Sequence, residues 1–243
     1  MWKSCSYETV GRAHVTAGLG CQDKTLRRSH KGVELIALAD GAGSVRHAEA
    51  GALAAVEAIG EVVCHQFEAL LEHGHHEAKF QIYETVLNRL EQRRLELGCR
   101  LEELASTLLL AAIKGNDYLV IHLGDGVVGY LESGALKVAT KPQTGEFANE
   151  TIFTTSAQAR ESLRVLKGQV GQIDGFFMMS DGAAHSLYDH RRMSFAPAIK
   201  EMLRANGKLE NEKATRWVGR IFDQHIVTRT MDDCSIAILS RSV

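Results

Sequence analysis

The stretch VELIALADGAG, from Val33 to Gly43, begins with seven mostly aliphatic residues, 33–39. These are followed by Asp40 and a glycine. A short apolar run of this kind is typical of a strand that is buried on both faces. A second run, FFMMSDG from Phe176 to Gly182, also ends in an aspartate followed by glycine. The sequence therefore predicts buried strands that each present an aspartate where they end.

Two long amphipathic helices are predicted between these strands. Apolar residues recur at steps of three or four, first at Ala52, Val56, Ile59, Val63, Phe67 and Leu70, and then at Phe80, Tyr83, Leu87, Leu90 and Leu97. This spacing places the apolar side chains of each helix on one face. Both helices are therefore expected to lie on a flat surface such as a sheet.

Short strands then follow one another in a block instead of alternating with helices. We expect them at residues 106–113, 118–123, 127–131 and 136–139, with Asp125 and Gly126 in one of the turns. This pattern predicts a meander of antiparallel strands. Two more helices fit residues 198–204 and 211–226, and a last strand fits residues 235–239. The grouping indicates an α+β sandwich, and we expect a single domain over residues 1–243.

The composition limits the classes of partner. The chain has 243 residues and a net charge of −2, without the clustered Lys and Arg that nucleic-acid-binding proteins carry. Its apolar runs, such as Leu108 to Ile113, are too short to span a membrane. The five cysteines contain no C-x-x-C pair, which favours reduced thiols. We therefore expect a cytoplasmic monomer with no nucleic-acid partner and no membrane partner.

Acidic residues stand next to several of the predicted strands. Asp40 and Asp181 follow buried strands, Asp23 precedes the first buried strand, and Asp232 precedes the last strand together with Asp233. Carboxylates gathered in one place repel each other and resist ionisation. A hard cation such as Mg²⁺ or Mn²⁺ removes this conflict because it prefers oxygen ligands. Aspartate followed by glycine is also an ordinary turn signal, but the ordered set favours a metal site.

Short motifs occur in one order along almost the whole chain: Gln22-Asp23, Ala39-Asp40-Gly41-Ala42-Gly43, Ser106-Thr107, Leu123-Gly124-Asp125, Ser180-Asp181-Gly182 and Asp232-Asp233-Cys234-Ser235. Each motif is weak alone, but the ordered set resembles the metal-dependent PPM, or PP2C-type, serine/threonine protein phosphatases. The stretches from Gly11 to His14 and from Gly145 to Thr151 resemble the bacterial branch in particular.

The resemblance implies a four-layer αββα sandwich of two antiparallel sheets flanked by helix pairs, with a binuclear Mn²⁺ or Mg²⁺ centre. Asp40 would bridge the two ions, Asp181 and Asp232 would hold the first ion, and the Gly41 carbonyl would help to hold the second. Asp23 would orient a water molecule. The implied activity is hydrolysis of phosphoserine and phosphothreonine in protein substrates, in opposition to a bacterial serine/threonine kinase.

The chain departs from the family pattern at several positions. Many members have a phosphate-binding arginine where this chain has Gly18, and Arg12, His14 or Arg46 could replace it. Ala42 stands where many eukaryotic members have a histidine. By the same resemblance, a third ion would fall near Glu102 or Glu103, and residues 145–155 would form a flap that selects the substrate. The missing arginine motivates an alternative, a catalytically weak phosphoprotein-binding module on the same fold.

Overall fold

Two five-stranded sheets, each antiparallel throughout, form the centre of the computed structural model, which describes residues 1–143 and 151–242. The first sheet has the order β1-β12-β9-β6-β7, with strands Trp2–Thr9, Cys234–Arg241, Ile173–Met179, Val127–Glu132 and Ala135–Thr140. The second has the order β2-β3-β4-β5-β8, with strands Lys24–His30, Val33–Ala39, Leu108–Lys114, Asp117–Leu123 and Arg164–Gln169.

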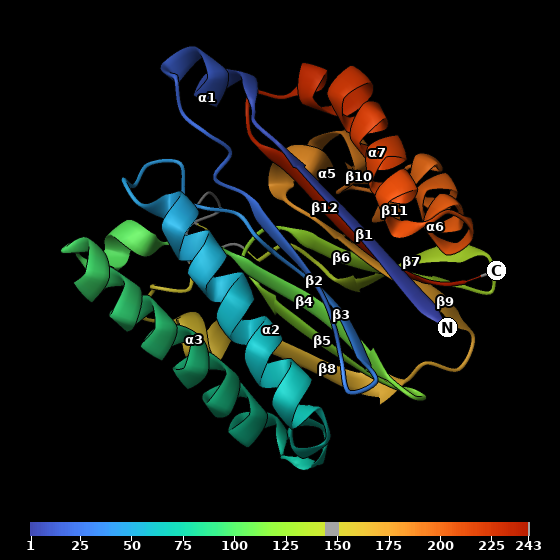
Figure 1. The fold of residues 1–243 in the computed structure, drawn as a ribbon, viewed down its shortest axis with the longest axis horizontal. Helices are drawn as coiled ribbons and strands as arrows, with labels where there is room; N and C mark the ends of the chain where they lie inside the picture. Colours follow the sequence, from blue (N-terminus) through green and yellow to red (C-terminus); the bar gives the residue numbers. More distant parts are fainter. Residues whose placement is uncertain (144–150, 243) are drawn as a thin grey trace.

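Helices cover the outer face of each sheet (Figure 1). The long helices α2 (Ala48–Glu72) and α3 (His75–Leu97) lie on the second sheet, and α6 (Ala198–Lys208) and α7 (Asn211–Ile221) lie on the first. The predicted four-layer αββα sandwich is therefore confirmed. In the part of the chain that the structure describes, no helix, not even the 25-residue α2, is long and apolar enough to cross a membrane.

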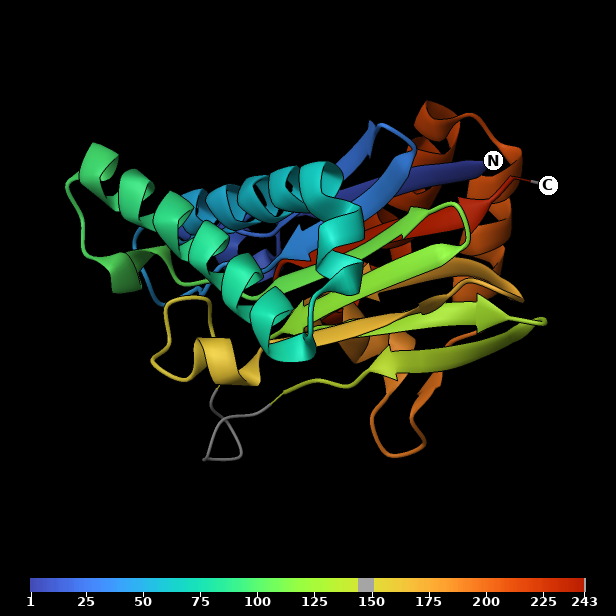
Figure 2. The ribbon, with the colours of Figure 1, turned by 90° about the horizontal axis from the view of Figure 1, so that it is seen from below.

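Short elements connect these layers, and Figure 2 shows the sandwich from a second side. They are α1 (Arg12–Ala17), α4 (Ala159–Ser162), α5 (Asp181–Leu187), the 3₁₀ turns Leu101–Leu104 and Val227–Arg229, the π-helical turn Phe222–Ile226, and the small hairpin of β10 (Tyr188–Asp189) and β11 (Ser194–Phe195). The chain ends meet, because the Ser242 amide donates a hydrogen bond to the Met1 carbonyl over 2.9 Å.

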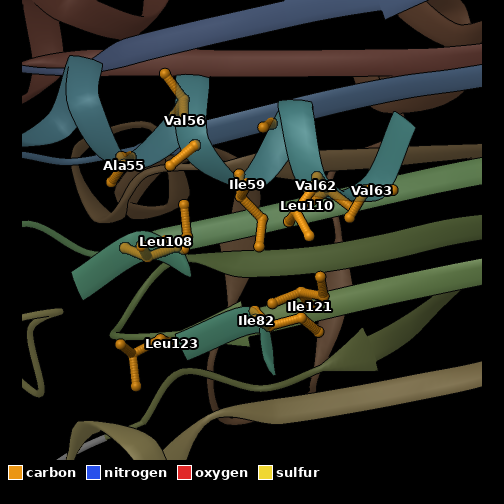
Figure 3. Close-up of a cluster of buried hydrophobic side chains, with 14 of the residues drawn as sticks. Ala55, Val56, Ile59, Val62, Val63, Ile82, Leu108, Leu110, Ile121 and Leu123 are labelled. Atoms are coloured by element: carbon orange, nitrogen blue, oxygen red, sulfur yellow. The ribbon is translucent and has the colours of Figure 1, made fainter. Parts of the chain in front are cut away.

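The inner strands are apolar on both faces because each face packs against a different layer. Along β3, Leu35 and Ala37 contact the helices, whereas Ile36 and Leu38 contact the other sheet. Figure 3 shows the helix side of this packing, where side chains of α2 and α3 meet those of β4 and β5. The strand predicted from the VELIALA run is therefore confirmed, and so is its burial on both faces.

Two expectations about packing were wrong. Strands β5 and β6 do not pair with each other, so the turn at Gly124 and Asp125 is a crossover between the two sheets and not part of a continuous meander. Turn residues reveal that the chain reverses, but apolar strands with two buried faces do not reveal which sheet each joins. Phe80 is 48% exposed, because the buried face of α3 runs instead through Ala78, Ile82, Val86 and Leu90.

Candidate active site

Strand register brings the predicted aspartates to one end of the sandwich. Lys24 pairs with Ala39 in the β2–β3 hairpin, so Asp23 and Asp40 lie next to each other at the same sheet end. In the other sheet, Met179 pairs with Ile236, which places the ends of β9 and β12 that adjoin Asp181 and Asp232 side by side. The charges of Asp23, Asp181 and Asp232 all act on Asp40, so the two sheets bring these four carboxyls into one cluster.

Asp23 lies at the bottom of this cluster. It is fully buried, and neither of its carboxylate oxygens has a hydrogen-bond partner of good geometry. Burial raises the pKa of Asp23 to about 7, and the nearby hydroxyls of Ser180 and Ser235 offset part of this effect. Buried polar atoms without a partner are rare and destabilising, so this carboxyl is built for a ligand other than the chain itself.

The other three carboxyls form the more open part of the cluster. Burial and the charges of Asp23 and Asp181 hold the pKa of Asp40 well above its usual range. Burial also raises the pKa of Asp181 and that of Asp232, although both residues retain substantial solvent contact. The cluster therefore runs from a buried floor at Asp23 to an exposed rim at Asp181 and Asp232.

Asp125 belongs to this cluster, although its position in an Asp-Gly turn suggested an ordinary reversal. Its negative charge raises the pKa of Asp181 and that of Asp232. The Thr151 hydroxyl donates a hydrogen bond to the Asp125 carboxylate. The sequence signal for it is the Leu123-Gly124-Asp125 motif of the ordered set, and the crossover places this motif at the end where the other aspartates lie.

Buried hydrogen bonds hold the crossover loop in place. His122 donates from Nε2 to the Gly124 carbonyl over 2.9 Å, and its Nδ1 accepts from the Thr140 hydroxyl. Burial lowers the pKa of His122 to about 4, so the ring is neutral at physiological pH. The Gln143 side chain accepts a hydrogen bond from the Gly124 amide over 2.9 Å. The backbone that carries Asp125 is therefore fixed by groups outside the cluster.

The donor set of the cluster fits a hard divalent cation. Both carboxylate oxygens of Asp23 lack a hydrogen-bond partner in the described part of the chain. The clustered carboxylates repel one another, and a bound cation would relieve this repulsion. Gly41 pairs with Ser106 in an isolated bridge, which holds the loop after Asp40 against the second sheet. Among the described side chains, however, no group of three or more His, Cys, Asp or Glu is already arranged around a common ion position.

Asp233 borders the cluster, where its charge adds to the raised pKa of Asp23, and it joins three segments. Its carboxylate accepts hydrogen bonds of 2.6 Å from the amides of Gly11 and Gln22. Two neighbouring segments pack so closely on the Asp232–Asp233 backbone that each needs a glycine there. A Cβ on Gly11 would lie 2.2 Å from the Asp232 carbonyl carbon, and a Cβ on Gly182 would lie 2.1 Å from the Asp233 carbonyl oxygen. Asp233 therefore has a structural role, and Asp232 is the member of the pair that faces the other acids.

Of the three predicted phosphate-binding candidates, the structure places His14 nearest the acids. Its Nδ1 lies 3.0 Å from an Asp233 oxygen, and its charge acts on Asp232. Arg12 donates to the Thr230 carbonyl over 2.8 Å on the exposed surface, and Arg46 lies beside Glu103. Gly18 ends α1 in the left-handed conformation, with φ of 71°, which explains why an arginine does not occupy this position.

The remaining predicted site residues lie in the turn before β4, which contacts the loop after Asp40, or outside the described residues. Glu102 and Glu103 are in the 3₁₀ turn before β4, where Glu103 accepts a hydrogen bond from the Arg100 amide. Burial raises the pKa of the Cys21 thiol far above its usual range, so this neighbour of Asp23 is an inert thiol. Of the predicted substrate-selecting flap, residues 145–150 fall outside the described residues.

Known proteins resemble this chain in fold and in sequence. Three solved structures match it with TM-scores of 0.66, 0.65 and 0.64 at 17%, 14% and 17% identity: PppA of Pseudomonas aeruginosa, Stp1 of Staphylococcus aureus, and the serine/threonine phosphatase of S. agalactiae. The matches cover 100%, 99% and 99% of this chain, and 98%, 95% and 100% of those chains respectively.

Sequence comparison identifies the family. Serine/threonine-protein phosphatase 3 of Escherichia coli (strain K12) is 29% identical over 168 residues, which is 65% of this chain and 64% of that protein, less than two thirds of its length. The family description Protein phosphatase 2C matches residues 10–221, which is most of the chain and includes four of the five clustered aspartates. This chain therefore belongs to the protein phosphatase 2C family.

Proposed function

We propose that this protein is a metal-dependent phosphatase that hydrolyses phosphoserine and phosphothreonine in protein substrates. The observation that carries the proposal is the cluster of Asp23, Asp40, Asp125, Asp181 and Asp232, with an unpaired carboxylate at its floor. The family, and the name of the Escherichia coli relative, support this class of reaction.

In this proposal Asp40, Asp181, Asp232 and the Gly41 carbonyl would hold two Mn²⁺ or Mg²⁺ ions, and Asp125 would add a ligand at the rim. When bound, such ions supply Lewis acidity toward water and phosphoryl oxygens. Asp23 would accept a hydrogen bond from water at the floor of the cleft and fix its orientation.

His14 would contact the phosphoryl group from the rim, in place of the arginine that Gly18 replaces. Asp233 lies 3.0 Å from the imidazole Nδ1, and a Cβ on Gly43 would lie 3.7 Å from His14 Nε2, so the ring is confined between two loops. We propose further that the protein acts as a single-domain monomer over residues 1–243 in the cytoplasm, where it would oppose a serine/threonine kinase.

The test is hydrolysis of p-nitrophenyl phosphate and of a phosphothreonine peptide, with Mn²⁺, with Mg²⁺ and with EDTA. We expect release of phosphate that requires the metal and that is lost in Asp40→Asn. Asp174→Asn, which removes an exposed carboxyl on β9, is the matched control and should retain full activity. Phosphopeptide binding without phosphate release under any metal would favour the binding-module alternative, and full activity of Asp40→Asn would refute the assigned centre.

A further inference from the structure

The outer face of α7 carries a groove that plays no part in the cluster of acids. It has a volume of about 740 Å³ and is lined by Leu209, Lys213, Arg216, Trp217 and Arg220. Lys213 is followed by Arg216 and Trp217 after three and four residues, and Arg220 lies four and three residues after these two, so the four side chains form one stripe along the helix. The opposite side of α7 is occupied by packing, since its residues Ala214, Val218 and Gly219 are buried.

The charges in this groove are only partly compensated. Lys213 forms an ion pair with Glu210 at 2.9 Å. Within residues 1–143 and 151–242, neither Arg216 nor Arg220 forms an ion pair or a side-chain hydrogen bond, and both are exposed. Two guanidinium groups therefore flank a half-buried indole, on a protein whose net charge is −2.

We propose that this surface, the α7 groove, binds an acidic peptide segment of a partner protein. Arginine presents a planar fork of N–H groups that matches a carboxylate, so Arg216 and Arg220 would each take one acidic side chain. Trp217 and Leu209 supply the apolar contact beside them, and tryptophan together with arginine dominates the binding energy of many protein interfaces. Helix α7, which carries the groove, belongs to the outer helical layer (Figure 1). The acids lie at the strand ends, so binding in the groove is independent of the proposed activity.

The full chain contains its own reporter of this binding. Trp217 is one of only two tryptophans, and Trp2→Phe leaves it as the single tryptophan, which can be excited selectively at roughly 295 nm or above, beyond tyrosine absorption. We would titrate this variant with a short acetylated poly-glutamate peptide at low salt, and measure both tryptophan emission and the anisotropy of a dye-labelled copy of the peptide. We expect saturable binding that weakens as salt is added, since exposed charges are screened.

The deciding comparison uses two double charge reversals with the same change in net charge. Arg216→Glu with Arg220→Glu should weaken peptide binding by at least about tenfold, equivalent to about 1.4 kcal/mol. Arg191→Glu with Arg192→Glu, in the exposed turn between β10 and β11, should leave binding unchanged. Circular dichroism would verify that both variants are folded.

Four results would overturn the proposal. They are absence of anisotropy change with poly-glutamate, equal weakening by both double variants, equally tight binding of poly-lysine, and binding only of a separate peptide that carries phosphoserine. Vesicles of phosphatidylglycerol that compete fully for the groove would assign it to a lipid surface instead. Unchanged hydrolysis of p-nitrophenyl phosphate by all these variants is expected, so the outcome here is separate from that of the proposed activity.

Discussion

The unpaired carboxyl of Asp23 makes a prediction about stability that needs no assay of turnover. In the folded protein its pKa is raised from 3.8 to about 7, whereas in the unfolded chain it returns to its ordinary value. The folded state therefore holds this proton more tightly, and its stability must fall as pH rises between those two values. Complete ionisation corresponds to about 4 kcal/mol of lost stability in the metal-free protein.

Asp23→Asn removes this ionisation but buries an amide without partners, which costs about 1–3 kcal/mol. The variant should therefore be less stable than the parent protein near pH 4 and more stable, by about 2 kcal/mol, near pH 8. We would measure urea unfolding in EDTA at a series of pH values, with Asp174→Asn as the matched control. The crossing of the two stability profiles is the signature.

Added Mn²⁺ should make the parent protein more stable than Asp23→Asn at high pH. An ion that binds only the folded state raises the stability of the protein with the higher affinity for it, and we expect this to be the parent protein. Parallel pH profiles for the parent protein and Asp23→Asn in EDTA would refute the reasoning, since they would mean that the carboxyl finds a partner in the fold. An Asp174→Asn profile that also crosses the parent profile would assign the effect to net charge instead.

Other substitutions test the support of the site, each by urea unfolding at neutral pH. Asp233→Ala leaves two buried amides without an acceptor and should cost about 2–4 kcal/mol, whereas Asp233→Asn, which keeps one acceptor, should cost less. Gly182→Ala places a Cβ 2.1 Å from a backbone oxygen and should cost more than about 2 kcal/mol, while Gly74→Ala in open space should change stability by less than about 0.5 kcal/mol. His122→Leu removes one of the two hydrogen bonds that the buried Gly124 carbonyl accepts, leaves the buried Thr140 hydroxyl without its imidazole partner, and should cost about 1–3 kcal/mol. A cost below about 0.5 kcal/mol for Asp233→Ala, Gly182→Ala or His122→Leu would contradict the role assigned to that residue.

The sequence was most informative where the local residue pattern alone determines the structure. The VELIALA run could only be a strand with two buried faces, and the aspartates at strand ends predicted the cluster that the register now explains. The amphipathic helices were predicted within a few residues, although the exposed Phe80 shows that periodicity fixes a helix better than it fixes the buried face.

Sequence reasoning failed where the outcome depends on which partner a segment finds. Asp125 has the same local signature as any turn, and only the crossover between sheets places it among the acids. The two neighbours Asp232 and Asp233 are identical residues with different roles, which their hydrogen bonds distinguish and their sequence does not. The left-handed conformation of Gly18 likewise could not be predicted, because it depends on α1 ending at this residue.

The order of strands in the first sheet bears on how the chain acquires its structure during synthesis. Strand β12 is the last strand to be made, yet it lies between β1, which is made first, and β9. Until it emerges from the ribosome, β1 has no neighbour in its sheet and exposes a free edge that other chains could pair with. Because Asp232 directly precedes this strand, the acidic cluster is also completed late, so a nascent chain should need protection by chaperones and should remain inactive until synthesis reaches β12.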